Sequence, residues 1–246
     1  MIDGIFVFAA CVFLLAGTIK GMIGIGLPTA SVTLLTQITD PRTAIALVVF
    51  PVMIANAWQV IRTGQVLQSA QTYGLFAVML MITLLATTRV VASASPAVLL
   101  LALGLVIALF AATSLVVQPP ALPDGLDKPA QFVAGTLAGF MGAFTAIWSP
   151  PMVIYFLARR LEKDEFVRAS GFLIFLGSLP LAAGYWAGGL MSGPTALTSL
   201  AMVVPALIGF QVGEMIRSRL NTERFRTVVL VIFFLMGLNL IRKAVA

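Results

Sequence analysis

Long uncharged stretches alternate with short charged segments along the whole chain, and residues 169–213 contain no charged side chain at all. About 20 apolar residues in a helix cross the ~30 Å hydrocarbon core of a bilayer. The pattern predicts eight such elements, at residues 4–37, 43–61, 70–88, 96–117, 131–158, 169–187, 195–216 and 225–241. The sequence therefore predicts an all-α, polytopic membrane protein.

Two of these elements, 4–37 and 131–158, are too long for one straight crossing. At 1.5 Å per residue they would extend roughly 50 Å and 42 Å. Small residues interrupt both near their middles, and glycine with proline breaks a regular helix. Each element is therefore predicted to be two half-helices, of about 11 to 17 residues, that meet at membrane depth.

The interruption occurs twice, which indicates a duplication. Three glycines with the spacing G-x3-G-x2-G recur 118 residues later, as Gly17, Gly21 and Gly24 and then as Gly135, Gly139 and Gly142. A segment that begins at Arg42 parallels one that begins at Arg168, 126 residues later. The predicted halves are 1–120 and 125–246, each a broken element followed by three spans. Hairpin-like broken elements would make the halves inverted, which we favour; single crossings would make them parallel.

The composition excludes a soluble protein. Of the residues, 60% are hydrophobic and only 10% are charged, and the mean hydropathy is +1.07. The net charge is +6, but the basic residues lie in short loops. We interpret them as signals of cytoplasmic loops at 159–168 and 217–226, with the C-terminus outside. No patch of basic and aromatic residues suggests nucleic acid. One cysteine and no histidine predict neither a metal site nor another cofactor.

Lys20 is the only charged residue of the first broken element, in the run GTIKGMIGIGLP. A charge inside the bilayer is costly and usually functional. Gly24 and Gly26 let the chain leave the helix and expose N–H groups, and Thr29 lies in the first turn of the next half-helix, whose N-terminus attracts anions. The alternatives are that Lys20 extends to the membrane interface and that small residues serve packing. Packing is the favoured interpretation for Gly17.

The second break carries hydroxyl and indole donors instead of a lysine. Thr145, Trp148 and Ser149 precede two prolines that suit the start of a half-helix. Trp148 fits a substrate site and an interfacial belt equally well. Gly135, like its counterpart in the first half, is expected to pack against another helix.

Asn56 and Gln59 lie three residues apart, on one face of an apolar helix. Amides inside a membrane need partners; substrate oxygens and interhelical bonds are equally good predictions. Glu214 also lies in an apolar segment, but near its end beside Arg217, where a surface ion pair is expected.

No acidic residue lies in the middle of a predicted span, and the chain has no histidine. A proton relay normally needs such a group, so coupling through carboxylates is disfavoured. No nucleophile–base set or pair of carboxylates is present either, so we predict that the protein is not an enzyme.

Taken together, these features resemble the TauE/SafE sulfite-exporter family of membrane permeases. The resemblance extends over nearly the whole chain: its length, its two halves, the glycine-rich break at Gly21–Pro28, the matching break at Gly139–Pro151, and the closing helix with the run Gly209-Phe210-Gln211-Val212-Gly213. It implies a multi-pass protein of the bacterial inner membrane that moves small organosulfur or carboxylate anions, such as sulfite or sulfoacetate, often outwards.

We therefore expect a transporter of small anions that works by alternating access. Its partners are an anionic substrate and the lipid bilayer, with a homodimer left open. The expected binding residues converge on one central site: Lys20, Gly24, Gly26, Thr29, Asn56, Gln59, Thr145, Trp148 and Ser149. An anion channel and a membrane scaffold or receptor without transport are the alternatives.

Overall fold

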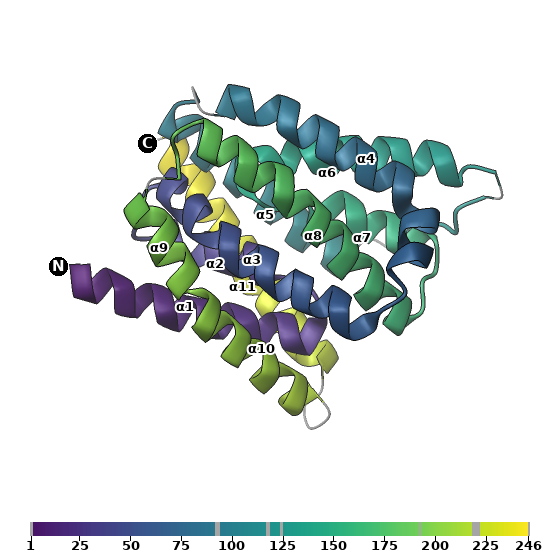
Figure 1. The fold of residues 1–246 in the computed structure, drawn as a ribbon, viewed down its shortest axis with the longest axis horizontal. Helices are drawn as coiled ribbons and strands as arrows, with labels where there is room; N and C mark the ends of the chain where they lie inside the picture. The colour runs from purple at the N-terminus through teal and green to yellow at the C-terminus, as the bar shows by residue number, and fades with distance from the viewer. Residues whose placement is uncertain are drawn as a thin grey trace.

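The computed structural model describes residues 2–91, 94–116, 119–123, 125–191, 193–217 and 222–245. The regular structure of these residues is entirely α-helical, as predicted (Figure 1). The helices are α1 (Ile2–Ile23), α2 (Leu27–Leu35), α3 (Pro41–Thr63), α4 (Val66–Val91), α5 (Pro96–Val116), α6 (Asp127–Thr145), α7 (Ser149–Ala158), α8 (Lys163–Ala187), α9 (Gly193–Ala201), α10 (Val203–Arg217) and α11 (Thr222–Val245).

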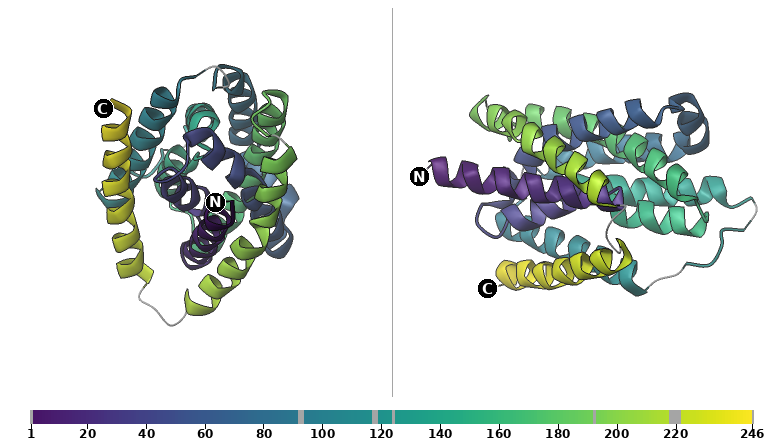
Figure 2. Two further views of the ribbon diagram at one scale, coloured as in Figure 1. Left: turned by 90° about the vertical axis from the view of Figure 1, so that its left-hand side faces the viewer. Right: turned by 90° about the horizontal axis from the view of Figure 1, so that it is seen from below.

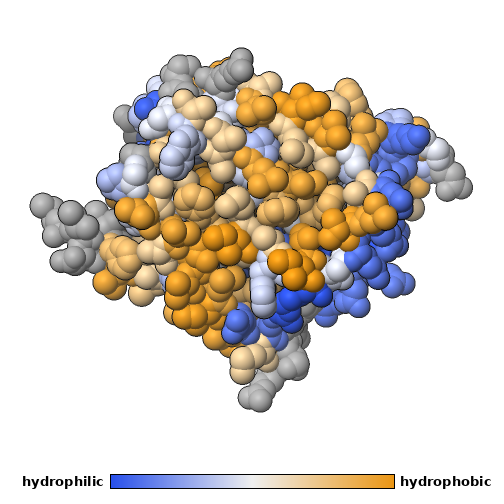
Figure 3. All heavy atoms as spheres, viewed as in Figure 1, coloured by the Kyte–Doolittle hydropathy of each residue, from blue (hydrophilic) through white to orange (hydrophobic). Residues whose placement is uncertain are grey.

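Seven segments of the described helices are long and apolar enough to cross a membrane. They lie in α1, α3, α4, α5, α8, the pair α9–α10, and α11. Helices α6 and α7 form the remaining predicted element, and α7 is itself short and apolar. Apolar side chains cover most of the face in Figure 3, and hydrophilic ones gather chiefly toward one end. The chain is therefore a multi-pass membrane protein, since lipid is the solvent that such a surface requires.

Both predicted breaks are present, and in each element the first helix is about twice as long as the second. Helices α1 and α6 have 22 and 19 residues, whereas α2 and α7 have 9 and 10. The expectation of half-helices with 11 to 17 residues is therefore wrong. The first break begins at Gly24, whose φ of 90° is left-handed, and the second at Ala146, with a φ of 54°. A helix ends where this conformation occurs, since left-handed residues cannot continue it.

Glycines upstream of each break do not end the helix because they serve close packing. A Cβ atom at Gly17 or Gly21 would lie within 3.0 Å of backbone atoms of α10. At Gly135 and Gly139 it would lie 2.6 and 2.5 Å from carbonyl oxygens of α4. Helix α1 therefore packs on α10, and α6 on α4, through small residues. The predicted packing roles of Gly17 and Gly135 are confirmed.

The chain reverses direction at each break. In Figures 1 and 2, α1 starts at the end of the bundle where both termini lie, α2 runs back toward that end, and α6 starts at the opposite end. Helices α1 and α6 end at residues 23 and 145, α2 and α7 begin at 27 and 149, and α3 and α8 begin at 41 and 163. Each pair is 122 residues apart. The offsets predicted between the two halves, 118 from the glycines and 126 from the segments at Arg42 and Arg168, each differ from this value by four residues, or about one helical turn. The inverted relation of the halves stays a prediction.

Candidate functional site

Lys20 lies in the last turn of α1 and points into the protein. Its side chain is 1% exposed, and Nζ donates a hydrogen bond to Oδ1 of Asn56 at 2.7 Å. Nζ also lies 5.6 Å from the ring centroid of Phe210. No carboxylate oxygen of the described residues is within 4.0 Å of it. The alternative that Lys20 extends to the membrane interface is therefore wrong.

A small cavity adjoins this ammonium group, and we call it the Lys20 cavity. Its volume is about 120 Å³, and it lies between the first broken element, α3, α8 and α10. Arg62 and Glu214 form an ion pair at its mouth, with Nη1 and Oε2 2.5 Å apart and side chains 48% and 34% exposed. The residues that line it are Lys20, Gly21, Gly24, Gln59, Arg62, Thr63, Val167, Phe210 and Glu214.

The two amides of α3 serve different purposes. Asn56 is occupied, because Oδ1 accepts from Lys20 while Nδ2 donates to the carbonyl of Val52 at 2.7 Å. Gln59 donates from Nε2 to the carbonyl of Val167 at 2.6 Å, which joins α3 to α8. Its Oε1 is buried and has no hydrogen-bond partner among the described residues. Hydrogen bonds within the protein therefore account for the Asn56 amide, but for only the Nε2 group of the Gln59 amide.

Gly24 lines the Lys20 cavity but does not supply a free backbone donor. Its N–H group donates to the carbonyl of Lys20 at 2.7 Å. The prediction that Gly24 offers this donor to a substrate is therefore wrong. Glycine is required here because its φ is left-handed and a Cβ atom would lie 3.1 Å from the Val167 side chain.

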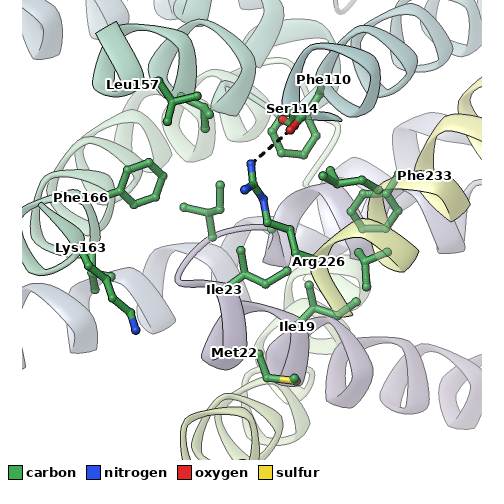
Figure 4. Close-up of a pocket in the computed structure, with 16 residues that line it drawn as sticks. Ile19, Met22, Ile23, Phe110, Ser114, Leu157, Lys163, Phe166, Arg226 and Phe233 are labelled. Carbon is green, nitrogen blue, oxygen red and sulfur yellow. Dashed lines mark hydrogen bonds between the residues drawn. The ribbon is translucent and has the colours of Figure 1, made fainter. Parts of the chain in front are cut away.

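Gly26 borders a second, larger cavity of about 320 Å³ between α1, α5, α7, α8 and α11. Most of the residues that line it are apolar (Figure 4). Its polar side chains are Lys163, Ser114 and Arg226, and Arg226 donates to the carbonyl of Ser114 at 3.3 Å. The apolar walls would leave most oxygens of a small oxyanion without donors. Thr29 lines neither cavity; it is fully buried, and its Oγ1 has no partner in the described part of the chain.

The residues of the second break line neither cavity. Thr145 caps the end of α6: its Oγ1 donates to one backbone carbonyl at 2.7 Å and accepts from one backbone N–H at 3.0 Å. Trp148 is 1% exposed and packs beside Gly142 and Gly177, so the interfacial-belt alternative is wrong. Trp148 Nε1 and Ser149 Oγ are buried, with no partner among the residues that the structure describes.

Four of the nine predicted residues lie together, namely Lys20, Gly24, Asn56 and Gln59. The others lie elsewhere along the helices. On α8, Gly171 faces Gln59 and Gly177 faces Trp148. These glycines are six residues apart, or about 9 Å of helix rise. Gln59 and Trp148 therefore lie at different levels along α8, and a role in substrate binding stays a prediction for all nine residues.

The sequence did not predict Arg62 or Glu214 as part of this site. The sequence predicts a surface ion pair for Glu214 beside Arg217, whose side chain lies outside the described residues; the structure shows a pair between Glu214 and Arg62. The two partners are 152 residues apart in the chain. No local pattern links them, since their contact depends on how α10 packs beside α3.

The chain was compared with protein families, curated proteins and solved structures. The model of one protein family, "Sulfite exporter TauE/SafE", matches residues 9–240, which is nearly the whole chain. No curated protein and no solved structure matches it.

Proposed function

Because the chain belongs to the sulfite exporter TauE/SafE family of membrane transporters, we propose that it carries small sulfite-type oxyanions and binds them in the Lys20 cavity. One observation carries this proposal: the buried Lys20 ammonium group lines a cavity, and among the described residues it has one hydrogen-bond partner and no close carboxylate. Lys has three N–H donors, and a buried charge is costly unless it is paired. A bound anion would supply the missing partner.

The size and charge of the Lys20 cavity support a small anion. Its volume of about 120 Å³ is well below the 300–1,000 Å³ typical of pockets for larger organic ligands. The two cations that line it, Lys20 and Arg62, outnumber the one acid, Glu214. The cavity thus keeps one net positive charge after Arg62 and Glu214 pair.

The position of the mouth fits the first step of export. Arg62 and Glu214 lie near the C-terminal ends of α3 and α10, which is the end of the bundle predicted to face the cytoplasm. In this conformation the cavity would therefore receive anions from the cytoplasm. Alternating access would follow if α1 and the α10 helix packed on it moved relative to α3 and α8, with the break after Gly24 as the hinge.

A flux measurement tests the proposal. Purified protein in liposomes loaded with sulfite should release it with saturable kinetics. Lys20→Met should lower the ratio kcat/KM about ten- to a hundredfold, because a hydrogen bond to a charged group contributes about 1.5–3 kcal/mol. Lys163→Met, which removes an exposed lysine outside the Lys20 cavity, serves as the control.

Unchanged sulfite flux in a folded Lys20→Met protein would overturn the assignment of the site. Flux that rises linearly with sulfite concentration, without saturation, would favour an anion channel over a carrier. The absence of anion flux in the wild-type protein would contradict transport itself.

A further inference from the structure

Gln59, which lines the Lys20 cavity together with Lys20, carries an unpaired hydrogen-bond acceptor. Gln59 is 3% exposed, and its bond from Nε2 to the Val167 carbonyl assigns the two ends of the amide. The carbonyl oxygen of the amide is therefore Oε1, which is buried and has no hydrogen-bond partner among the described residues. Lys20 and Gln59 both line the cavity, and Asn56, one turn before Gln59, accepts the bond from Lys20.

An unpaired acceptor discriminates between ligands. A buried acceptor without a donor costs about 1–3 kcal/mol. The described residues leave Oε1 unpaired, and Gln59 lines the Lys20 cavity. A ligand that brings only acceptors leaves Oε1 unpaired, whereas a ligand with an O–H or N–H group supplies the missing donor. An oxyanion without hydrogens would also place its negative oxygens near the carbonyl oxygen of Gln59.

The charges around the cavity favour a single negative charge on the ligand. Glu214 lines the same cavity as Lys20, and the Glu214 carboxylate is bonded to Arg62 at 2.5 Å. Among the described residues that line the cavity, only Lys20 is then left to balance the charge of the ligand. A dianion would carry one uncompensated negative charge out of water, which is costly.

We propose that the Lys20 cavity selects monoanions that carry their own hydrogen-bond donor, with the negative oxygens on Lys20 and the donor on Oε1 of Gln59. This selectivity rests on the proposed function. Hydrogen sulfite and hydroxyalkyl sulfonates belong to the selected class. Sulfate, the sulfite dianion and simple alkyl sulfonates do not, since the first two are dianions and the last have no donor.

Two probes that differ by one hydroxyl group test this selectivity at constant charge. The affinities of 2-hydroxyethanesulfonate and ethanesulfonate for the purified full chain are measured by titration calorimetry. The wild-type protein should bind the hydroxylated probe about tenfold more tightly; one factor of ten corresponds to 1.4 kcal/mol, within the cost of an unpaired acceptor. In Gln59→Leu the ratio should fall to about one. Gln71→Leu, at an exposed glutamine of α4, should keep the wild-type ratio.

The outcomes separate this selectivity from the proposed function. Equal affinities of the two probes in the wild-type protein, both lost in Lys20→Met, would overturn the selectivity and leave the anion site in place. A tenfold preference that persists in Gln59→Leu would mean that the hydroxyl group of the probe bonds to another residue, and it would overturn the role of Gln59. If Gln59→Leu does not fold, the wild-type ratio decides. Binding of neither probe and no sulfite flux would contradict the proposed function itself.

Discussion

Lys20 shows how a single buried charge can be held without a permanent counter-ion. Asn56 accepts one hydrogen bond from it, and the face of Phe210 lies within range of a cation–π contact. The acid that lines the same cavity, Glu214, is bonded to Arg62. A salt bridge to Lys20 would stabilise the empty protein, but an incoming anion would have to break it. Neutral partners leave the ammonium group available to an anion.

Glu214 should weaken anion binding from the mouth of the cavity. Glu214→Gln removes a negative charge that an entering anion meets, so binding should tighten about two- to fivefold, in line with the roughly 0.5–1 kcal/mol of partly exposed charge pairs. The gain should shrink at high salt, which screens exposed charges. Sulfite affinity measured by calorimetry at low and high ionic strength tests this.

Asp164→Asn is the matched control, because Asp164 is exposed and does not line the Lys20 cavity. It should leave the affinity unchanged. Weaker binding in Glu214→Gln would instead mean that the Arg62–Glu214 pair organises the site, and it would contradict a repulsive role.

At the scale of the helices, the small-residue contact between α1 and α10 sets the position of Lys20. Gly17 and Gly21 approach the backbone of α10, and Gly209 and Gly213 approach the backbone of α1 from the other side. This contact places Lys20 between α3 and α10. It also means that α1 and α10 would move as one unit in a transport cycle, because a close-packed interface does not slide freely.

Gly17→Ala should destabilise the protein, because the new methyl group would overlap backbone atoms of Ala206 and Phe210. Overpacking of this kind costs about 1–3 kcal/mol, and the apparent Tm in detergent should fall by several degrees. Gly74→Ala should leave the Tm unchanged or raise it, since no atom lies within 4 Å of that Cβ position and alanine favours helix by up to about 1 kcal/mol. Equal Tm values for the two variants would contradict close packing at Gly17.

At the scale of the whole molecule, the orientation in the membrane decides whether the mouth of the Lys20 cavity opens toward the cytoplasm. Both termini lie at one end of the bundle (Figure 1). The positive-inside rule predicts that this end is outside and that the loop before Lys163 is inside. Part of the other predicted cytoplasmic loop, residues 218–221, lies outside the described residues.

Cysteine labelling of intact cells tests this orientation. In a Cys11→Ser background, Val245→Cys should react with a membrane-impermeant thiol reagent, whereas Lys163→Cys should react only after the cells are opened. Both positions are exposed, so burial does not limit the reaction. The reverse pattern would place the mouth of the Lys20 cavity outside, and it would contradict loading of the cavity from the cytoplasm in this conformation.

Much of the fold could be predicted from the sequence, because hydrophobic length and glycine–proline interruptions are local signals. The spans, both breaks and the burial of Lys20 in the membrane region depend on such signals. Such signals do not fix the number of residues that separates equivalent positions in the two halves. Packing glycines recur every four residues within a helix, so a shift by one turn still matches, as the offsets of 118 and 126 did against 122.

Contacts between distant segments could not be predicted. Gln131 inserts its amide into the kink of α4 at Tyr73, where it donates to the Thr72 carbonyl and accepts from the Phe76 N–H group. The Arg62–Glu214 pair likewise joins helices that are far apart in the chain. No local sequence pattern predicts which distant residue a glutamine or a charged residue at a helix end will contact. For the same reason the sequence grouped nine residues in one site without showing that three of them, Lys20, Gly24 and Gln59, line one small cavity.

The location of a bound anion is the most direct test of the central claim that the Lys20 cavity is the transport site. Selenite has the shape and charge of sulfite, and its selenium atom can be located by anomalous diffraction from crystals of the protein. We expect selenite oxygens at about 2.7–3.0 Å from Lys20 Nζ, the usual length of a charge-assisted hydrogen bond. Selenite bound only in the larger cavity of Figure 4, or only beside Trp148, would contradict the account.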